Sequence, residues 1–220
     1  DIDPITYNIC CDKLAEKLRT AKLKGTLPKV VIPVHLTGQS CDMEKISKLG
    51  IEYGFRIIED ASHAIGGQYN GQRIGSCKYS DITVFSFHPV KIITSGEGGM
   101  ALTNNKDLAK SMSHLRSHGI IRDKKILNNK KEIRGYYEQQ HLGYNYRITD
   151  IQCALGISQM NRIKNFITYR NKIAKLYIKS LKNLDLKFQK IPSRVRSTYH
   201  LFVIRVNKTI KKKLFKVFIK

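Results

Sequence analysis

The sequence has no run of 18 apolar residues, which excludes a hydrophobic transmembrane helix. It also lacks a C-x-x-C pair, because its cysteines are few, odd in number and scattered. This pattern indicates a reducing compartment and argues against a disulfide framework or a zinc site. No charged-then-apolar secretory segment opens the chain, so we expect a cytoplasmic protein without membrane contact. The cysteines are Cys10, Cys11, Cys41, Cys77 and Cys153.

Acidic residues are scarce in the second half of the chain. Residues 1–100 carry 12 Lys and Arg against 11 Asp and Glu, whereas residues 101–220 carry 28 against 6. Clustered basic residues can neutralise phosphates, so a basic nucleic-acid-binding module is one interpretation. No helix-turn-helix, zinc finger or aromatic RNA-binding motif is legible, however. A solvated basic face is therefore the favoured interpretation, because charge alone specifies neither fold nor function.

The first half of the chain alternates strand and helix patterns. The β-branched run at 29–36 predicts a buried strand, residues 42–54 a helix, and residues 55–62 a second strand. This order forms a βαβ unit and favours a parallel sheet. Strands are also expected at 81–87 and 98–104, and their short connection allows an antiparallel hairpin.

Helices dominate the second half. Residues 105–119 predict a helix ending at a glycine, and residues 120–147 read as a long, irregular loop of the kind that is often functional. Thr149 and Gln152 fit a capping box that opens a long helical region, which a kink or break could divide. After this region we expect a strand over 197–206 and then a basic amphipathic helix over 208–220.

One lysine occupies an unusual place. Lys91 ends an apolar run and precedes a glycine-rich turn in "FSFHPVKIITSGEGGM", where burial is costly for a charged side chain. Asp60 and Ser86 lie at or near the ends of predicted strands, where open α/β sheets bind ligands. A lysine, a carboxylate and a hydroxyl there suit pyridoxal 5'-phosphate (PLP), which needs a Schiff-base lysine and a carboxylate at its pyridine nitrogen. The plain alternatives are a strand-end cap for Asp60 and a core hydroxyl for Ser86.

Five sequence motifs occur in a fixed order along the chain and resemble those of a known family. "PVHLTGQSCDM", "IEDASHAIGG", "FSFHPVKIITSGEGGM", "LRSHG" and "LGYNYRITDIQCALG" together resemble the DegT/DnrJ/EryC1/StrS sugar aminotransferases, from residue 1 to about 206. The resemblance implies an α/β fold, the aspartate aminotransferase-like fold type I of PLP-dependent transferases. It implies an incomplete PLP-binding large domain at 1–160, a connecting helical region at 161–195, and the start of a C-terminal small domain at 196–220.

The resemblance also implies residue roles. Lys91 matches the lysine that holds the cofactor and shuttles the proton, and Asp60 matches the carboxylate at the pyridine nitrogen. His63 matches the position beside the phenolic oxygen, and Ser86 matches a phosphate ligand. Asn145 matches an asparagine that reaches the phosphate of the partner subunit, which implies a homodimer with shared active sites.

Two further residues, His35 and Arg147, lie in matching motifs near the site and are candidate substrate contacts. The motifs look most like those of enzymes that aminate a UDP-linked 4-keto-6-deoxy-N-acetylhexosamine on the pseudaminic acid route. This implies glutamate as amino donor and a place in surface polysaccharide or flagellin-glycan synthesis. A sister branch that dehydrates its substrate has histidine at the position of Lys91, so the lysine argues for amination.

The chain departs from the family pattern at both ends. An upstream phosphate-binding segment with a ring-stacking aromatic and most of the small domain have no counterpart here, so we expect an internal fragment. An inactive truncated remnant of such an enzyme is therefore an alternative function. His114 and His118 have a metal-ligand spacing on one helix, but no acidic or cysteine partner is near and no metal is expected.

Overall fold

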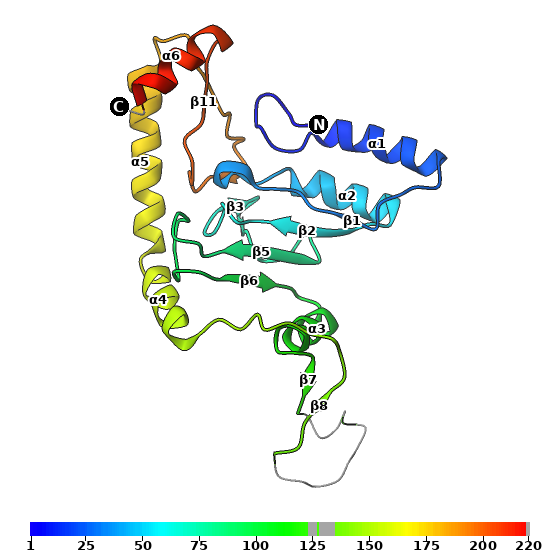
Figure 1. The fold of residues 1–220 in the computed structure, drawn as a ribbon. Coiled ribbons are helices and arrows are strands. Elements are labelled where there is room, and N and C mark those ends of the chain that lie inside the picture. Colours follow the sequence, from blue (N-terminus) through cyan, green and yellow to red (C-terminus); the bar gives the residue numbers. More distant parts are fainter. Residues whose placement is uncertain (123–126, 128–134, 219–220) are drawn as a thin grey trace.

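The computed structural model describes residues 1–122, 127 and 135–218. Its centre is a four-stranded sheet in the order β1-β2-β5-β6, made of β1 (Val30–Val31), β2 (Arg56–Asp60), β5 (Ile82–Ser86) and β6 (Gly99–Leu102). The first three strands are parallel, and β6 runs antiparallel to β5. Figure 1 shows β2 and β5 pointing the same way, with β6 reversed below them. The predicted parallel sheet and its antiparallel hairpin are both confirmed. The buried strand predicted over 29–36 is wrong for most of its length, because only Val30–Val31 forms a strand and Val30 is 42% exposed at the edge of the sheet.

The predicted βαβ unit forms from β1, α2 (Met43–Tyr53) and β2. Asp42 caps α2 by accepting a hydrogen bond from the Lys45 N–H, and Gly54 ends it at φ 76°. A left-handed residue at this point is easiest for glycine, which carries no Cβ. The buried side of α2 packs with β2 and with α1 (Cys11–Leu23), a helix that the sequence patterns did not predict.

The other half of the core lies beneath β5. The turn after β2, strand β5 and the loop after it bury their apolar side chains against the long helix α5 (Ile163–Leu181). Burial of each such side chain contributes roughly 1.5–3 kcal/mol, so this cluster fixes the loop that carries Lys91. The buried members are Ala61, Ala64, Ile65, Ile74, Phe85, Phe87, Ile92, Ile93 and Ile167.

The predicted helix over 105–119 is shorter than expected. It forms α3 (Lys106–Arg116), which Asn105 caps with its side-chain oxygen. The helix stops because Ser117 leaves helical geometry and forms a bridge with Asn145. The predicted loop over 120–147 contains a small hairpin, β7 (Ile120–Ile121) with β8 (Glu138–Gln139), and its residues 123–126 and 128–134 lie outside the described part.

The capping box is present: Thr149 and Gln152 bond each other's backbone and open α4 (Asp150–Met160). Asn161 and Arg162 separate α4 from α5, so the long helical region is indeed broken. In Figure 1, α4 and α5 run along one side of the sheet, past the arrowheads of β2 and β5. These helices therefore border the edge at which ligands bind in such sheets.

The predicted strand over 197–206 is wrong for most of its length. Only β11 (Ile204–Arg205) forms, paired with β9 (Lys187–Phe188). Ser197 and Thr198 instead bond the carbonyl of Gly38, and Tyr199 takes a left-handed φ of 47°. Tertiary hydrogen bonds replace the sheet ladder that the alternating pattern favours.

The remaining elements are short. A separate three-stranded sheet has the order β10-β3-β4, made of β10 (Val195–Arg196), β3 (Gln68–Tyr69) and β4 (Gln72–Arg73). A 3-10 turn covers Leu36–Gly38, and α6 (Lys208–Phe218) is the predicted basic helix. None of the helices within the described ranges is both long and apolar enough to cross a lipid bilayer.

Candidate active site at the carboxyl ends of the strands

Asp60 and Ser86 end neighbouring parallel strands, as predicted. Asp60 of β2 pairs with Val84 of β5, and Ser86 lies two residues further on β5, opposite Gly99 of β6. One oxygen of the Asp60 carboxylate accepts a hydrogen bond from the Ser62 N–H at 3.0 Å. The turn after β2 therefore fixes the orientation of this carboxylate.

Lys91 lies in the turn that follows β5. Its N–H donates to the His88 carbonyl at 3.0 Å, and the buried side chains of Ile92 and Ile93 follow directly. Further along the turn, Ser95 donates its N–H to the Phe87 carbonyl at 3.1 Å. The lysine is thus partly buried on a loop that is anchored on both sides, rather than on a freely moving one.

His63 joins Asp60 and Lys91 in one cluster. Partial burial lowers the pKa of His63, the positive charge of Lys91 lowers it further, and the Asp60 carboxylate opposes both. The charges of Lys91 and Asp60 therefore both act on His63, as expected for groups at the same edge of the sheet. His63 Nδ1 also accepts a hydrogen bond from the Thr37 N–H at 3.3 Å, so the ring is oriented from one side.

The structure places His35 away from open solvent. Its ring is 0% exposed; Nε2 lies 2.7 Å from a Glu59 carboxylate oxygen, and Nδ1 accepts from the Cys41 N–H at 3.2 Å. Both ring nitrogens are therefore engaged inside the domain. Its expected substrate contact stays a prediction, and the described bonds give it an internal, structural role.

Glu59 is the buried partner of His35. Burial raises the pKa of Glu59, but hydrogen bonds from His35, Ser80 and Thr83 and the attraction of His35 outweigh it and hold the pKa below the ordinary value. A carboxylate whose pKa is lower in the folded than in the unfolded state stabilises the fold above the unfolded value, about 4.3 for Glu. This stabilisation is lost as the pH falls through the lower, folded-state pKa.

Glu59→Gln is expected to lower the unfolding free energy by about 3–5 kcal/mol at pH 7, because it breaks a buried pair and leaves a mismatched amide facing two hydroxyls. The variant should also lose part of the acid destabilisation that we expect of the wild type as the pH falls below about 4.3. Urea unfolding at several pH values measures both effects. The exposed Glu52→Gln serves as control. A decrease in the unfolding free energy of less than about 0.5 kcal/mol, as at an ordinary surface site, would contradict a stabilising role of the His35–Glu59 pair.

Asn145 and Arg147 lie elsewhere in the same chain. The Asn145 backbone bridges Ser117, just after α3, and both side chains are exposed. In Figure 1, α3 lies at the opposite end of the sheet from the arrowheads of β2 and β5. The structure therefore brings Asp60, His63 and Lys91 together and does not bring Asn145 or Arg147 to that cluster within one chain.

Two residues that the sequence patterns did not single out face the cluster. The His200 ring centroid lies 4.4 Å from that of His63, and Arg170 of α5 donates to the His200 carbonyl at 3.2 Å. Lys91 is close enough to contribute to lowering the pKa of His200. The only sequence signal was a histidine inside a segment, "STYHLF", that otherwise resembles a strand.

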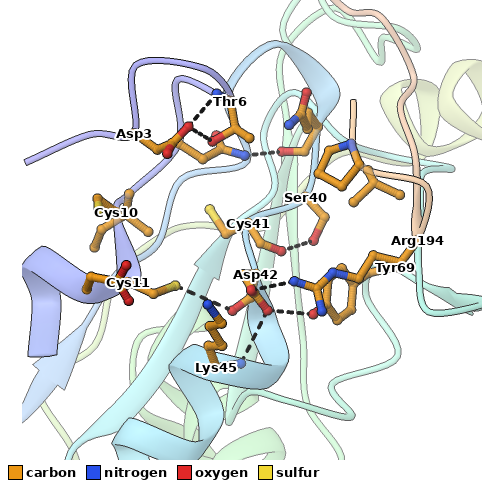
Figure 2. Close-up of a pocket in the computed structure, with 16 residues that line it drawn as sticks. Asp3, Thr6, Cys10, Cys11, Ser40, Cys41, Asp42, Lys45, Tyr69 and Arg194 are labelled. Atoms are coloured by element: carbon orange, nitrogen blue, oxygen red, sulfur yellow. Dashed lines mark hydrogen bonds and ion pairs between the residues drawn. The ribbon is translucent and has the colours of Figure 1, made fainter. Parts of the chain in front are cut away.

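A pocket of about 180 Å³ lies apart from this cluster, between the N-terminal segment and the start of α2 (Figure 2). Asp42 binds Arg194 there and accepts from the Tyr69 hydroxyl at 2.7 Å. Burial and the nearby Asp42 carboxylate raise the pKa of Cys11 to about 11, so this thiol is protonated at neutral pH. Such a thiol is a poor nucleophile, and all five cysteines are free.

Metal-binding clusters are absent from the described ranges: no group of three or more His, Cys, Asp and Glu side chains there could hold an ion. The donor set around Lys91 instead fits PLP. An amine, a fixed carboxylate and an imidazole lie together, and the buried Nδ1 of His200 has no hydrogen-bond partner within the described part of the chain.

Comparison with known proteins decides the family. The profile of the DegT/DnrJ/EryC1/StrS aminotransferase family matches residues 1–220. The chain belongs to this family. Aminotransferases of the family depend on PLP, and the resemblance seen in the motifs is confirmed.

Individual relatives agree with this assignment. The chain is 40% identical over 172 residues to the UDP-4-amino-4,6-dideoxy-N-acetyl-beta-L-altrosamine transaminase of Campylobacter jejuni, covering 78% of the chain and 43% of the relative. It is 35% identical over 208 residues to the GDP-perosamine synthase of Caulobacter vibrioides, covering 94% and 51%.

A solved structure supports the fold. Helicobacter pylori PseC, an aminotransferase involved in the biosynthesis of pseudoaminic acid, superposes with a TM-score of 0.82 at 28% identity, covering 96% of this chain and 53% of that one. The chain thus spans about half the length of the proteins it matches. Its fold is the expected α/β fold of PLP-dependent sugar aminotransferases.

Proposed function

We propose that the protein carrying this chain is a PLP-dependent aminotransferase that aminates a nucleotide-linked keto sugar. The observation that carries the proposal is the cluster of Lys91, Asp60 and His63 at the carboxyl ends of β2 and β5, in a chain that matches the family along its whole length. A ligand-binding edge of this kind is where open α/β sheets hold cofactors.

When bound, PLP supplies an electron sink that stabilises negative charge at the carbon bearing the reacting amine. Lys91 would hold the cofactor and, once released, carry a proton to and from that carbon as base and then acid. Asp60, fixed by the Ser62 N–H, would keep the pyridine nitrogen protonated. His63 would lie beside the phenolic oxygen, and Ser86 would donate its hydroxyl to the phosphate.

The proposed substrates are glutamate and a UDP-linked 4-keto-6-deoxy-N-acetylhexosamine. Support comes from the 40% identical Campylobacter jejuni transaminase, which is named for a UDP-linked amino sugar of this type. The proposed setting is surface polysaccharide or flagellin-glycan synthesis in the cytoplasm. The proposed domain division remains 1–160, 161–195 and 196–220.

A homodimer with shared active sites is part of the proposal. Asn145 would bind the phosphate in the partner subunit's site, with Arg147 as a substrate contact nearby. Support comes from their exposed position, apart from the Lys91 of the same chain, and from the stacked, exposed rings of Tyr144 and Tyr146, whose centroids lie 4.8 Å apart. Exposed aromatic side chains of this kind are enriched where protein surfaces meet.

The test is an amination assay with the complete gene product, PLP, glutamate and the UDP-linked 4-keto sugar. We expect 2-oxoglutarate and a UDP-amino sugar in equal amounts, identified by mass. A GDP-linked 4-keto-6-deoxyhexose serves as the matched substrate, because one relative is a GDP-perosamine synthase. Amination of the GDP sugar alone would overturn the proposed substrate, and amination of neither would overturn the proposed function.

A further inference from the structure

His200 carries a buried polar atom that has no hydrogen-bond partner among the described residues. The residue is 7% exposed, and its Nδ1 has no hydrogen bond to any described residue. Its ring lies against that of His63, with centroids 4.4 Å apart and an interplanar angle of 40°. Buried polar side-chain atoms are nearly always hydrogen-bonded in native proteins. The free Nδ1 therefore indicates a ligand atom at this position.

The backbone holds His200 rigidly in this place. Thr198 donates its hydroxyl to the His63 carbonyl at 3.0 Å, and Arg170 donates to the carbonyls of Tyr199 and His200, each at 3.2 Å. A side chain at Gly38, whose φ is 96°, would collide with the Thr198 hydroxyl at 2.1 Å. The close approach of the two loops thus fixes the distance between the two imidazoles.

The surroundings of His200 are cationic. Burial, together with the charges of His63, Lys91 and Arg170, lowers the pKa of His200 to about 4. Asp60 faces His63 in the same cluster. The His200 ring is therefore neutral at pH 7 in the free protein. A site with a lysine, an arginine and a free imidazole nitrogen suits an anionic oxygen.

We propose that His200 Nδ1 binds the α-carboxylate of the amino donor, an inference that rests on the proposed function. The amine of the donor must reach the site of Lys91, and its carboxylate is attached to the same carbon as that amine. The carboxylate therefore lies within a few bonds of Lys91, where His200 presents its free nitrogen. The role of His200 is substrate binding and positioning rather than proton transfer.

The proposal has a consequence for pH. A bound carboxylate favours the protonated imidazole, so it raises the pKa of His200 above its free value of about 4. Binding then takes up a proton, and carboxylate affinity increases as the pH falls from above the pKa of the complex toward 4. His63 also has a lowered pKa and contributes its own share, so the comparison is made between variants at His200.

The experiment compares three variants of the complete gene product. His200→Phe keeps the ring volume and removes both nitrogens. His200→Asn keeps a polar group near the position of Nδ1, but its amide does not titrate. His114→Asn, on α3, is the matched control. Calorimetry with 2-oxoglutarate in two buffers measures affinity and proton uptake across pH, and KM values for glutamate and for the keto sugar are measured separately.

We expect His200→Phe to weaken the binding of 2-oxoglutarate about 10- to 100-fold and to raise the glutamate KM by a similar factor. This is the effect of losing one hydrogen bond to a charged group. The keto-sugar KM should change less than about twofold, and His200→Asn should recover most of the affinity for 2-oxoglutarate with less proton uptake than the wild type. A raised keto-sugar KM with unchanged glutamate KM would overturn the proposal, as would unchanged proton uptake in His200→Asn. If His200→Phe does not fold, the proton uptake of His200→Asn on binding 2-oxoglutarate tests the proposal. Wild-type protein that binds no dicarboxylate would instead refute the proposed function.

Discussion

Lys91→Ala is expected to leave the complete gene product without covalently held PLP and to lower turnover by about 10⁴-fold or more, since we propose that this one residue supplies both covalent attachment and proton transfer. Borohydride reduction of the wild type followed by peptide mapping should place the cofactor on Lys91. The exposed Lys78→Ala, in the turn before β5, is the matched control and should keep the label and the activity. Label on another lysine would refute the assignment.

The same variant tests the shared active site. Lys91→Ala and Asn145→Ala chains, each inactive or nearly so, are mixed, dissociated and reassociated. If Asn145 serves the partner subunit, one site of each mixed dimer is intact and about a quarter of the wild-type activity returns. No recovery in mixed dimers that have been isolated and verified would place Asn145 in the same site as the Lys91 of its own chain.

The next prediction concerns the 220-residue chain expressed alone. It is expected to turn over at least about 10³-fold more slowly than an ordinary enzyme's roughly 1–10³ per second, and to self-associate. It spans about half the length of the relatives it matches, and we expect that contacts to the cofactor and substrate also come from sequence outside these 220 residues. Lost charged hydrogen bonds cost roughly 1.5–3 kcal/mol each, and several such losses weaken binding by orders of magnitude.

The surface of the chain gives a physical reason for the self-association. A groove of about 720 Å³, lined mainly by apolar side chains, lies between the β5–β6 face and helices α4 and α5. Among the described residues no strand pairs with the outer edge of β6. Unpaired sheet edges and large apolar surfaces promote association. The groove includes Phe85, Phe87, Met100, Leu102, Ile148, Ile157, Met160 and Ile163.

Light scattering and the amination assay, with excess PLP, measure both properties of the isolated chain. A monodisperse monomer with turnover in the ordinary enzyme range would show that Asp60, His63, Ser86 and Lys91 suffice without further sequence. Addition of a detergent below its micelle concentration is the control for association through the apolar groove, because it should reduce scattering without restoring activity.

Local sequence signals determined much of the fold. Asp42 and Gly54 mark the ends of α2 because capping and left-handed glycine geometry depend on only a few neighbouring residues. The capping box of Thr149 and Gln152 opened α4 for the same reason. The short connection between β5 and β6 gave the antiparallel pair. Each of these features is settled within about ten residues of chain.

The sequence by itself therefore determined the parallel sheet, the strand-end positions of Asp60 and Ser86, and the family motifs around Lys91. Only the tertiary structure decided that His200, more than 100 residues away, faces Lys91 and His63, and that His35 is taken up by Glu59. It also decided that residues 197–200 bond Gly38 rather than a strand. The physical reason is that alternation and capping are local properties, whereas the partner of a buried polar atom is chosen by packing between distant segments.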